Sequence, residues 1–141
     1  TGEDGQKHRP VMIHRVVLGS IERFIGVITE HFAGAFPAWL SPVQVELLPV
    51  TDRAAGYADS VAAALDGKNF RVEVDHRSEK IGKKIREAQL QKIPYMLVVG
   101  DRDMENQTVS VRHRTGEDMG AMSLEQFAQL LGDEVREKTI R

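Results

Sequence analysis

The stretch from Val74 to Asp101 constrains the fold most, because a strand pattern, a helix pattern and a second strand pattern follow one another in it. Val74 ends an alternating apolar run, and Ser78 stands where it can cap a helix whose apolar residues recur at helical spacing. Tyr95–Val99 is a short apolar run bounded by proline and glycine, which is typical of a strand buried on both faces. The stretch therefore predicts a helix packed against a sheet.

Strand and helix patterns also alternate in the residues before this stretch. The predicted elements are strands 43–50, 70–74 and 95–99 and helices 54–65 and 79–92. Strands joined by helices of about a dozen residues imply right-handed crossovers and a largely parallel sheet covered on both faces. The predicted fold class is α/β, with a mixed, mostly parallel sheet flanked by helices.

The regular alternation of strand and helix patterns ends after residue 99. We interpret residues 105–107 as a hairpin turn that leads into an antiparallel strand over 108–114, and residues 116–120 as a loop. Ser123 is placed to cap a last amphipathic helix. The apolar residues of that helix, which we expect to face the sheet, are Leu124, Phe127, Leu130, Leu131 and Val135.

The N-terminal part has a different pattern. Residues 9–18 alternate as a strand, Gly19 interrupts it, and Ser20 can cap a helix with an apolar stripe. A strand and helix of about 35 residues cannot form a stable core alone, so we expect them to belong to a larger domain. Residues 33–42 read as a packed linker, which divides the chain into domains 1–40 and 41–141.

Composition excludes several classes of protein. The 141 residues include no cysteine, which rules out a disulfide framework or a thiolate metal site built from this chain. A net charge of −2 argues against a nucleic-acid binder that relies on overall positive charge. No apolar run approaches the roughly 20 residues that span a bilayer, and the first residues do not form a secretory signal, so we expect a cytoplasmic protein without a membrane partner.

Positive charge is concentrated locally. Between Arg71 and Lys92, seven basic residues stand against four acidic ones, and a second basic pair follows on the strand over 108–114. The basic residues that we expect the helix to turn to solvent are Lys80, Lys83, Lys84 and Arg86. Those expected to meet at one rim are Arg77, Lys80, Lys84, Arg112 and Arg114. A solvated helix face is the common explanation of such a pattern, and a surface that binds a phosphate-rich polymer is the functional one.

The sequence contains no complete catalytic apparatus. It has no glycine-rich phosphate loop, nucleophile elbow or paired-carboxylate motif. His14 is a single histidine among apolar neighbours, which by itself is more typical of a half-buried side chain than of a metal ligand. Arg23 could hold a nucleotide phosphate or pair with Glu22 or Glu30.

Two blocks of the sequence resemble a known family. The string HRPVMIHRVVLGSIERFIGVITEHFAGAFPAWLSPVQV resembles motif 3 of the class II aminoacyl-tRNA synthetases, in the form found in threonyl-tRNA synthetases. The strings VDHRSEKIGKKIREAQLQKIPYMLVVGD and VSVRHRTGED resemble the anticodon-binding domain of the same family. The resemblance implies a class II anticodon-binding domain preceded by a strand and helix from the end of a catalytic domain.

For the N-terminal block, the resemblance implies roles in ATP and zinc binding. Arg23 matches the motif 3 arginine that contacts ATP phosphates during adenylate formation, and Ser20 lines the same pocket. His14 matches one of three protein ligands of a zinc ion that recognises threonine. The two other ligands and motifs 1 and 2 lie upstream in the family. We therefore expect ATP and zinc to be bound by the full-length enzyme, and neither cofactor binding nor aminoacylation by this fragment alone.

For the C-terminal block, the resemblance implies tRNA binding. The family's anticodon contacts match Ser78, Arg86, Asp103 and Arg112, and the expected tRNA backbone contacts are Arg77, Lys80, Lys83, Lys84 and Arg114. Ser78 replaces the family's usual asparagine and Asp103 its usual glutamate, and both keep hydrogen-bonding groups with a shorter reach.

The partners that the resemblance implies are threonine tRNA and, for the full enzyme, threonine, ATP and a second subunit of a homodimer. We expect the fragment to be monomeric and not to bind DNA. Two alternatives remain open. One is a non-catalytic RNA-binding or regulatory module built on an anticodon-binding domain. The other is a small-molecule α/β enzyme, which would need a ligand pocket at the carboxyl ends of the strands.

Overall fold

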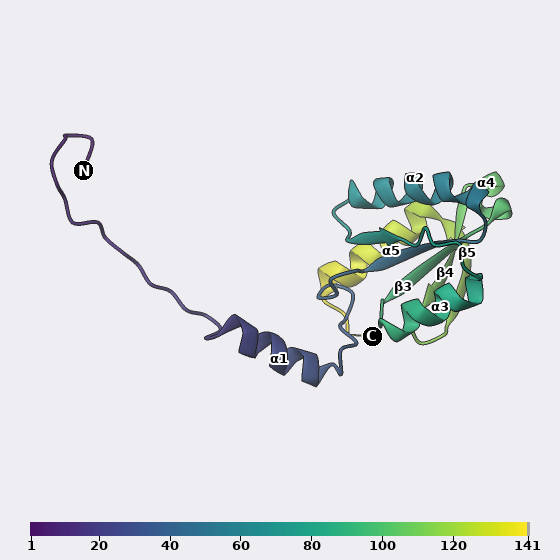
Figure 1. The fold of residues 1–141 in the computed structure, drawn as a ribbon, viewed down its shortest axis with the longest axis horizontal. Coiled ribbons are helices and arrows are strands. Elements are labelled where there is room, and N and C mark those ends of the chain that lie inside the picture. The colour runs from purple at the N-terminus through teal and green to yellow at the C-terminus, as the bar shows by residue number, and fades with distance from the viewer. Residues whose placement is uncertain (141) are drawn as a thin grey trace.

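The computed structural model describes residues 1–140, which form an extended N-terminal segment, one helix and an α/β unit (Figure 1). Residues 9–18, predicted as a strand, contain no strand, because no other segment of residues 1–140 offers them a hydrogen-bonding partner. Helix α1 spans Ile21–His31, and the Ser20 side chain caps it by accepting a hydrogen bond from the Arg23 amide at 3.4 Å. The predicted helix and its cap are therefore confirmed, and the predicted strand is wrong.

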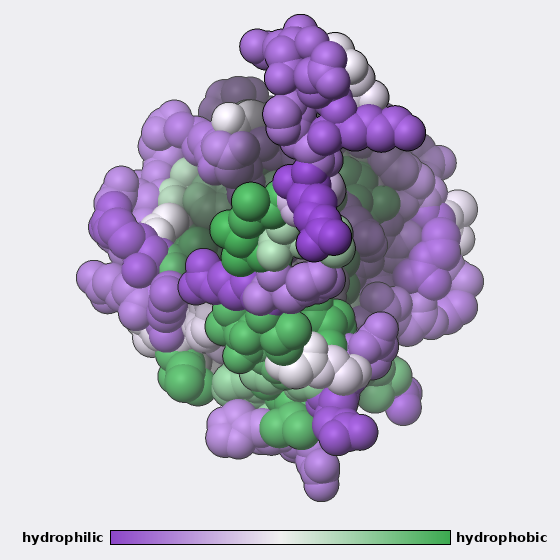
Figure 2. Space-filling view, turned by 90° about the vertical axis from the view of Figure 1, so that its left-hand side faces the viewer, coloured by the Kyte–Doolittle hydropathy of each residue, from purple (hydrophilic) through white to green (hydrophobic). Residues whose placement is uncertain are grey.

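The apolar stripe of α1 is largely uncovered in the part of the chain that the structure describes. Helix α1 contains no buried residue, and the extended segment before it exposes Val11 by 89% and Ile13 by 87%. Figure 2, which looks at the molecule from the side of this segment, shows apolar side chains gathered in the middle of the face with hydrophilic residues around them.

The α/β unit is built on a five-stranded sheet with the order β2-β1-β3-β4-β5 (Figure 1). Its strands are β1 (Val45–Pro49), β2 (Val72–Val74), β3 (Tyr95–Val99), β4 (Thr108–His113) and β5 (Asp118–Ser123). Strand β1 pairs in parallel with both β2 and β3, whereas β4 is antiparallel to both β3 and β5. The sheet is mixed and the fold class is α/β, as predicted.

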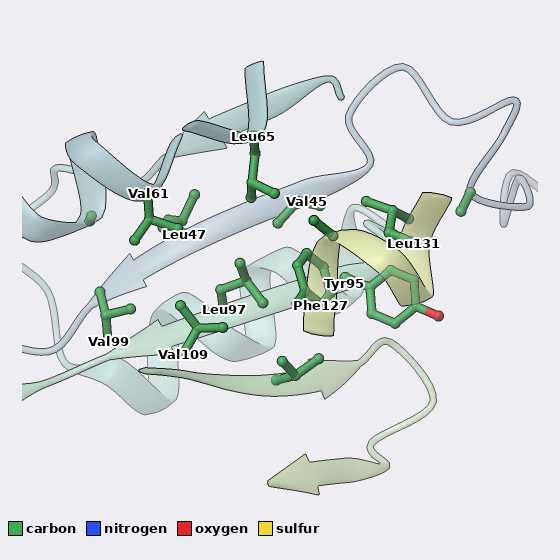
Figure 3. Close-up of a cluster of buried hydrophobic side chains, with 14 residues drawn as sticks. Val45, Leu47, Val61, Leu65, Tyr95, Leu97, Val99, Val109, Phe127 and Leu131 are labelled. Carbon is green, nitrogen blue, oxygen red and sulfur yellow. The ribbon is translucent and has the colours of Figure 1, made fainter. Parts of the chain in front are cut away.

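Helices cover both faces of this sheet. They are α2 (Ala55–Asp66), which follows a short 3-10 turn at Asp52–Ala54, α3 (Ile81–Leu90), α4 (Asp101–Asn106) and α5 (Leu124–Glu137). Helices α2 and α5 pack on one face, where their side chains join the main core, and α3 packs on the other (Figures 1 and 3).

The core explains why β3 reads as a continuous apolar run and why β1 is apolar except at Glu46. Leu47 and Leu97 are register partners on adjacent strands, and both lie in the cluster covered by α2 and α5 (Figure 3). Leu48 and Met96 point to the opposite face and pack against Ala88 of α3. A strand between two helical layers must be apolar on both sides, which confirms the prediction for Tyr95–Val99.

The linker is packed, as predicted. Ala38 is buried, and Arg71 donates hydrogen bonds from Nε to the Ser41 carbonyl at 2.8 Å and from a terminal nitrogen to the Trp39 carbonyl at 3.2 Å. Gln44 donates to the Ala38 carbonyl at 2.8 Å. These side chains satisfy linker carbonyls that would otherwise be left without partners, so the linker lies fixed on the α/β unit.

Three local predictions are wrong. Ser78 does not cap α3, which begins at Ile81 with Lys80 in the N-cap position and no side-chain cap. Residues 105–107 are not a hairpin turn, because α4 runs to Asn106 and Gln107 ends it in a left-handed conformation. Residues 118–120 are not loop, because they begin β5 and pair with β4. Aspartate and glycine disfavour strands, and only the neighbouring strand imposes the extended backbone there.

Candidate nucleic-acid interface

The carboxyl ends of β1, β2 and β3 meet at one edge of the sheet, because these three strands are parallel. The loops that follow them lie side by side, and the Val50 amide donates a hydrogen bond to the Val99 carbonyl at 2.9 Å. A hollow of about 290 Å³ opens at this edge, and its lining includes Pro49, Thr51, Asp52, Arg77, Ser78 and Lys84. This edge is where open α/β sheets usually bind ligands.

The basic residues of α3 divide into two groups. Lys80, Lys83 and Arg86 are exposed, and Lys83 pairs with Glu79 at 2.6 Å. Lys84 is only 4% exposed, and its Nζ donates to the Asp75 carbonyl at 2.9 Å and to the Pro49 carbonyl at 3.3 Å. The expectation that Lys84 lies on a solvent face of the helix is therefore wrong.

Arg77 is held between two carboxylates. Its guanidinium lies 2.7 Å from Asp75 Oδ2 and 2.6 Å from Glu87 Oε2. The hydrogen bonds from Arg77 hold the pKa of the buried Asp75 carboxyl below its usual range, and the two carboxylates raise the pKa of Arg77. Much of the positive charge of Arg77 is thus balanced within the protein, although its side chain is half exposed.

Asp103 and Arg112, two of the expected anticodon contacts, lie on the face of the sheet that carries α3. Asp103 Oδ2 accepts from the Gly100 amide at 3.0 Å, and Oδ1 accepts from the Ser110 hydroxyl at 3.1 Å. Arg112, two residues along β4 from Ser110, pairs with Asp118 at 2.8 Å and keeps a partly exposed side chain. The tertiary structure therefore orients the carboxylate and leaves the guanidinium within reach of solvent.

Arg114 lies at the other end of the sheet. Its NH1 donates to the Phe36 carbonyl at 2.5 Å and to the Lys92 carbonyl at 3.3 Å. Because β4 runs antiparallel to β3, Arg114 lies near Pro94 at the start of β3, far along the sheet from the hollow. The expectation that Arg112 and Arg114 meet the basic residues of α3 at one rim is wrong for Arg114, which holds the linker.

The residues expected to bind ATP and zinc lie on the N-terminal segment. Ser20 and Arg23 are neighbours at the start of α1, where they line an exposed hollow of about 310 Å³, and the Ser20 hydroxyl donates to Glu22 at 2.8 Å. His14 is exposed in the extended segment. Nowhere in residues 1–140 do three histidine, aspartate or glutamate side chains come close enough to hold a metal ion. His14 therefore does not form a complete zinc site with other residues of the described chain.

The sequence reasoning missed two parts of this site. Thr51 and Asp52 line the hollow, and Ser110 orients Asp103. The first two directly follow a predicted parallel strand, so the rule that ligands bind at the carboxyl ends of such strands could have found them. No sequence signal points to Ser110, whose role depends on the pairing of β3 with β4.

In the part of the chain that the structure describes, no helix has the length and apolar character that would be needed to cross a membrane.

Comparisons with known proteins agree on one family. The family model for the anticodon binding domain matches residues 44–134. The chain is 63% identical, over 139 residues, to threonine–tRNA ligases of Syntrophomonas wolfei and Desulforamulus reducens; in each case the match covers 99% of this chain and 22% of the relative. The solved RNA binding domain of threonyl-tRNA synthetase from Cryptosporidium parvum has a TM-score of 0.77 and 37% identity, covering 82% of this chain and 29% of that one. The chain thus spans about a fifth of the length of the curated relatives it matches.

Proposed function

Because the chain belongs to the anticodon binding domain family, in the form carried by threonine–tRNA ligases, we propose that its α/β unit recognises the anticodon of threonine tRNA. The observation that carries this proposal is that Asp103 and Arg112 lie on the face of the sheet that also carries α3, a helix with the exposed basic residues Lys83 and Arg86. Unpaired bases are read through hydrogen bonds to their exposed edges, often from arginine, whereas lysine and arginine attract the phosphates.

Each group has a distinct part in this proposal. Asp103 accepts hydrogen bonds from base amino or imino groups, since its carboxylate is already oriented by Ser110 and the Gly100 amide. Arg112 exchanges its exposed pair with Asp118 for a base edge, an exchange that costs little because exposed ion pairs contribute about 0–1 kcal/mol. Lys80 and Lys83 supply salt-dependent attraction to the backbone, and the exposed Arg86 stays an expected contact of the anticodon.

The hollow at the carboxyl edge also meets the geometric requirement of the alternative, a small-molecule α/β enzyme. Its lining, however, contains no nucleophile paired with a base and no phosphate loop. The family match and the relatives favour RNA as the partner.

We further propose that residues 1–40 form the end of a catalytic domain in a longer protein that attaches threonine to its tRNA at the expense of ATP. Two observations support this: the threonine–tRNA ligases match the chain through 99% of its length, and the apolar residues before and within α1 are exposed. In that setting, the preceding part of the protein covers the apolar face, and Arg23 and Ser20 contact ATP phosphates. Zinc binding by His14 would require ligands from outside this chain.

The test of anticodon recognition is binding of the full 141-residue chain to a threonine tRNA anticodon stem-loop, beside a stem-loop with altered anticodon bases, over a range of salt concentrations. We expect the parent stem-loop to bind at least about 10-fold more tightly, and Arg112→Ala to abolish this preference, because one good arginine–base contact contributes about 1–3 kcal/mol.

Arg136→Ala is the matched control, because this arginine is exposed on α5, away from the α3 face, and pairs only with Asp133 among the ion pairs of residues 1–140. It should bind as the unaltered chain does. Equal, steeply salt-dependent binding of both stem-loops by the unaltered chain would show phosphate attraction alone and would contradict the proposal.

A further inference from the structure

Lys84 is the most buried basic residue of α3, and its ammonium group joins the ends of two strands. The Pro49 carbonyl closes β1 and the Asp75 carbonyl directly follows β2, and Nζ donates to both. An ammonium group has three N–H donors, and these two contacts use two of them. The same side chain lines the hollow at the carboxyl edge, so the third donor is available to whatever enters it.

The charges around the hollow attract a phosphate group only weakly. The ionisable residues in its lining are Asp52, His76, Arg77, Glu79, Lys80 and Lys84. Arg77 is held by Asp75 and Glu87, Glu79 pairs with Lys83, and Asp52 opposes the charges of Lys80 and Lys84. A backbone phosphate can reach the exposed lysines of α3 while it stays in water, but reaching Lys84 would require it to lose that water.

A neutral, flat group with a hydrogen-bond acceptor fits this site better. The volume of about 290 Å³ is at the lower limit of sites for small molecules, which suits one base rather than several nucleotides. An extruded base can enter while its phosphates remain outside, and its carbonyl oxygens or ring nitrogens can accept from an ammonium group.

We propose that Lys84 determines specificity by donating a hydrogen bond, from inside the hollow, to guanine O6 or uracil O4 of one unpaired anticodon base. This inference rests on the proposed function and assigns Lys84 to a base rather than to the tRNA backbone. A base without the acceptor would leave a buried charged donor unpaired, which is the arrangement that gives the strongest discrimination.

The experiment uses the full chain and three versions of the threonine tRNA anticodon stem-loop. Every threonine tRNA has one guanine and one uracil in its anticodon that pair with the constant bases of the threonine codons. One analogue carries 2-aminopurine in place of the guanine, which removes O6, and the other carries pyrimidin-2-one in place of the uracil, which removes O4. Each is titrated against the unaltered chain, Lys84→Met and Lys68→Met, the last being a partly exposed lysine near Glu125 and outside the hollow.

We expect one analogue to weaken binding by the unaltered chain and by Lys68→Met about 10-fold to 100-fold, the range for a hydrogen bond to a charged group. The same analogue should not weaken binding by Lys84→Met any further, because the donor is already gone. If Lys84→Met loses the same factor as the unaltered chain on each analogue, Lys84 has only a structural role and the inference is overturned, while anticodon recognition stands. If the unaltered chain does not distinguish any altered anticodon, the proposed function fails and the inference fails with it.

A second measurement does not depend on the folding of Lys84→Met, which leaves two backbone carbonyls without their donor. A buried, hydrogen-bonded ammonium group exchanges its protons slowly, so the ¹⁵Nζ signal of Lys84 can be followed by NMR in the unaltered chain. This signal should shift on addition of the parent stem-loop and stay in place with the analogue that lacks the acceptor. A signal that responds in the same way to all three stem-loops would overturn the inference.

Discussion

The N-terminal segment and the α/β unit are both rich in apolar residues, yet they bury them to opposite extents. Val11 is 89% exposed and Ile25 is 51% exposed, whereas Leu47 and Leu97 are completely buried. Both regions carry clear patterns, since α1 has an apolar stripe and β3 an apolar run. The difference teaches that a pattern specifies which face will be buried, and only a partner segment buries it.

The α/β unit contains its own partners. Its parallel strands lie beside one another, and the helices that connect or follow them return across the two faces. Residues 9–18 have no such partner among residues 1–140, so their backbone groups and side chains stay in solvent. We therefore expect stability measurements to separate the two regions sharply.

The largest expected difference is between matched truncations of buried and exposed side chains. Leu97→Ala should lower the free energy of unfolding by about 3–5 kcal/mol, because it opens a cavity in the core. Ile25→Ala should change it by less than about 0.5 kcal/mol, because the side chain is half exposed and touches no core. Urea unfolding followed by circular dichroism gives both values. Similar losses would show that α1 belongs to the same cooperative unit as the sheet.

Glu46 is a carboxyl group within a buried strand, so it tests how burial, in contrast to exposure, changes the behaviour of a side chain. It is 8% exposed, its Oε2 has no hydrogen-bond partner, and burial, followed by the charges of Asp75 and Glu73, raises its pKa from 4.5 to about 7. Between these two pH values, the folded chain keeps a proton that the unfolded chain loses. The free energy of unfolding should therefore fall as pH rises from about 4.5 to about 7 and then level off.

Glu46→Gln should remove this part of the pH dependence. At pH 8 we expect the variant to be more stable by roughly 2–3 kcal/mol, and at pH 4 to differ little, since one pKa unit corresponds to about 1.4 kcal/mol. Urea unfolding at several pH values measures the effect. Glu125→Gln is the control at an exposed position and should show no such trend. An unchanged pH profile in Glu46→Gln would mean that Glu46 is solvated in the folded protein.

Two serine caps give a smaller and cleaner contrast. Ser20 and Ser123 both accept a hydrogen bond from an amide in the first turn of their helices. Ser123→Ala should lower the free energy of unfolding by about 1 kcal/mol, the usual effect of losing a cap, because α5 packs on the core. Ser20→Ala should leave the cooperative transition unchanged and affect only local helix content, which hydrogen exchange at the amides of α1 would report.

The smallest expected effect is that of removing residues 1–31. The linker from residue 36 onward is held by Arg71, Gln44 and Arg114, so the α/β unit should keep its unfolding free energy within about 0.5 kcal/mol. Thermal unfolding of the shortened and full chains provides the measurement. A large loss would mean that the N-terminal segment docks on the unit in solution.

Local chemistry made part of the fold predictable. The limits of β3 agree with the predicted strand 95–99, and Ser123 caps α5 as its hydroxyl and spacing indicate. Strand β5 was missed, because Asp118 and Gly120 carry no strand signal and are held extended by β4. The strand expected over 9–18 failed for the converse reason: its alternation is a strand pattern without a neighbouring strand.

The candidate site was predictable to a similar extent. The family resemblance pointed to Asp103 and Arg112, and the structure places both on the α3 face. Their roles and that of Ser78 in binding tRNA stay predictions. Sequence periodicity did not reveal that Lys84 is buried or that Arg114 holds the linker. The sequence pattern of a basic residue is the same whether its side chain faces water or a backbone carbonyl.

The sequence by itself determined the secondary-structure periods, the α/β class and the family, because these depend on the order of apolar, polar and turn residues along the chain. Tertiary structure alone decided which charged side chains reach solvent. Lys83 and Lys84 are neighbours in the sequence, yet one is half exposed and the other joins the ends of β1 and β2. The physical reason is that the environment of a charged side chain depends on groups that are far away in sequence, and only the folded sheet brings those groups within hydrogen-bonding distance.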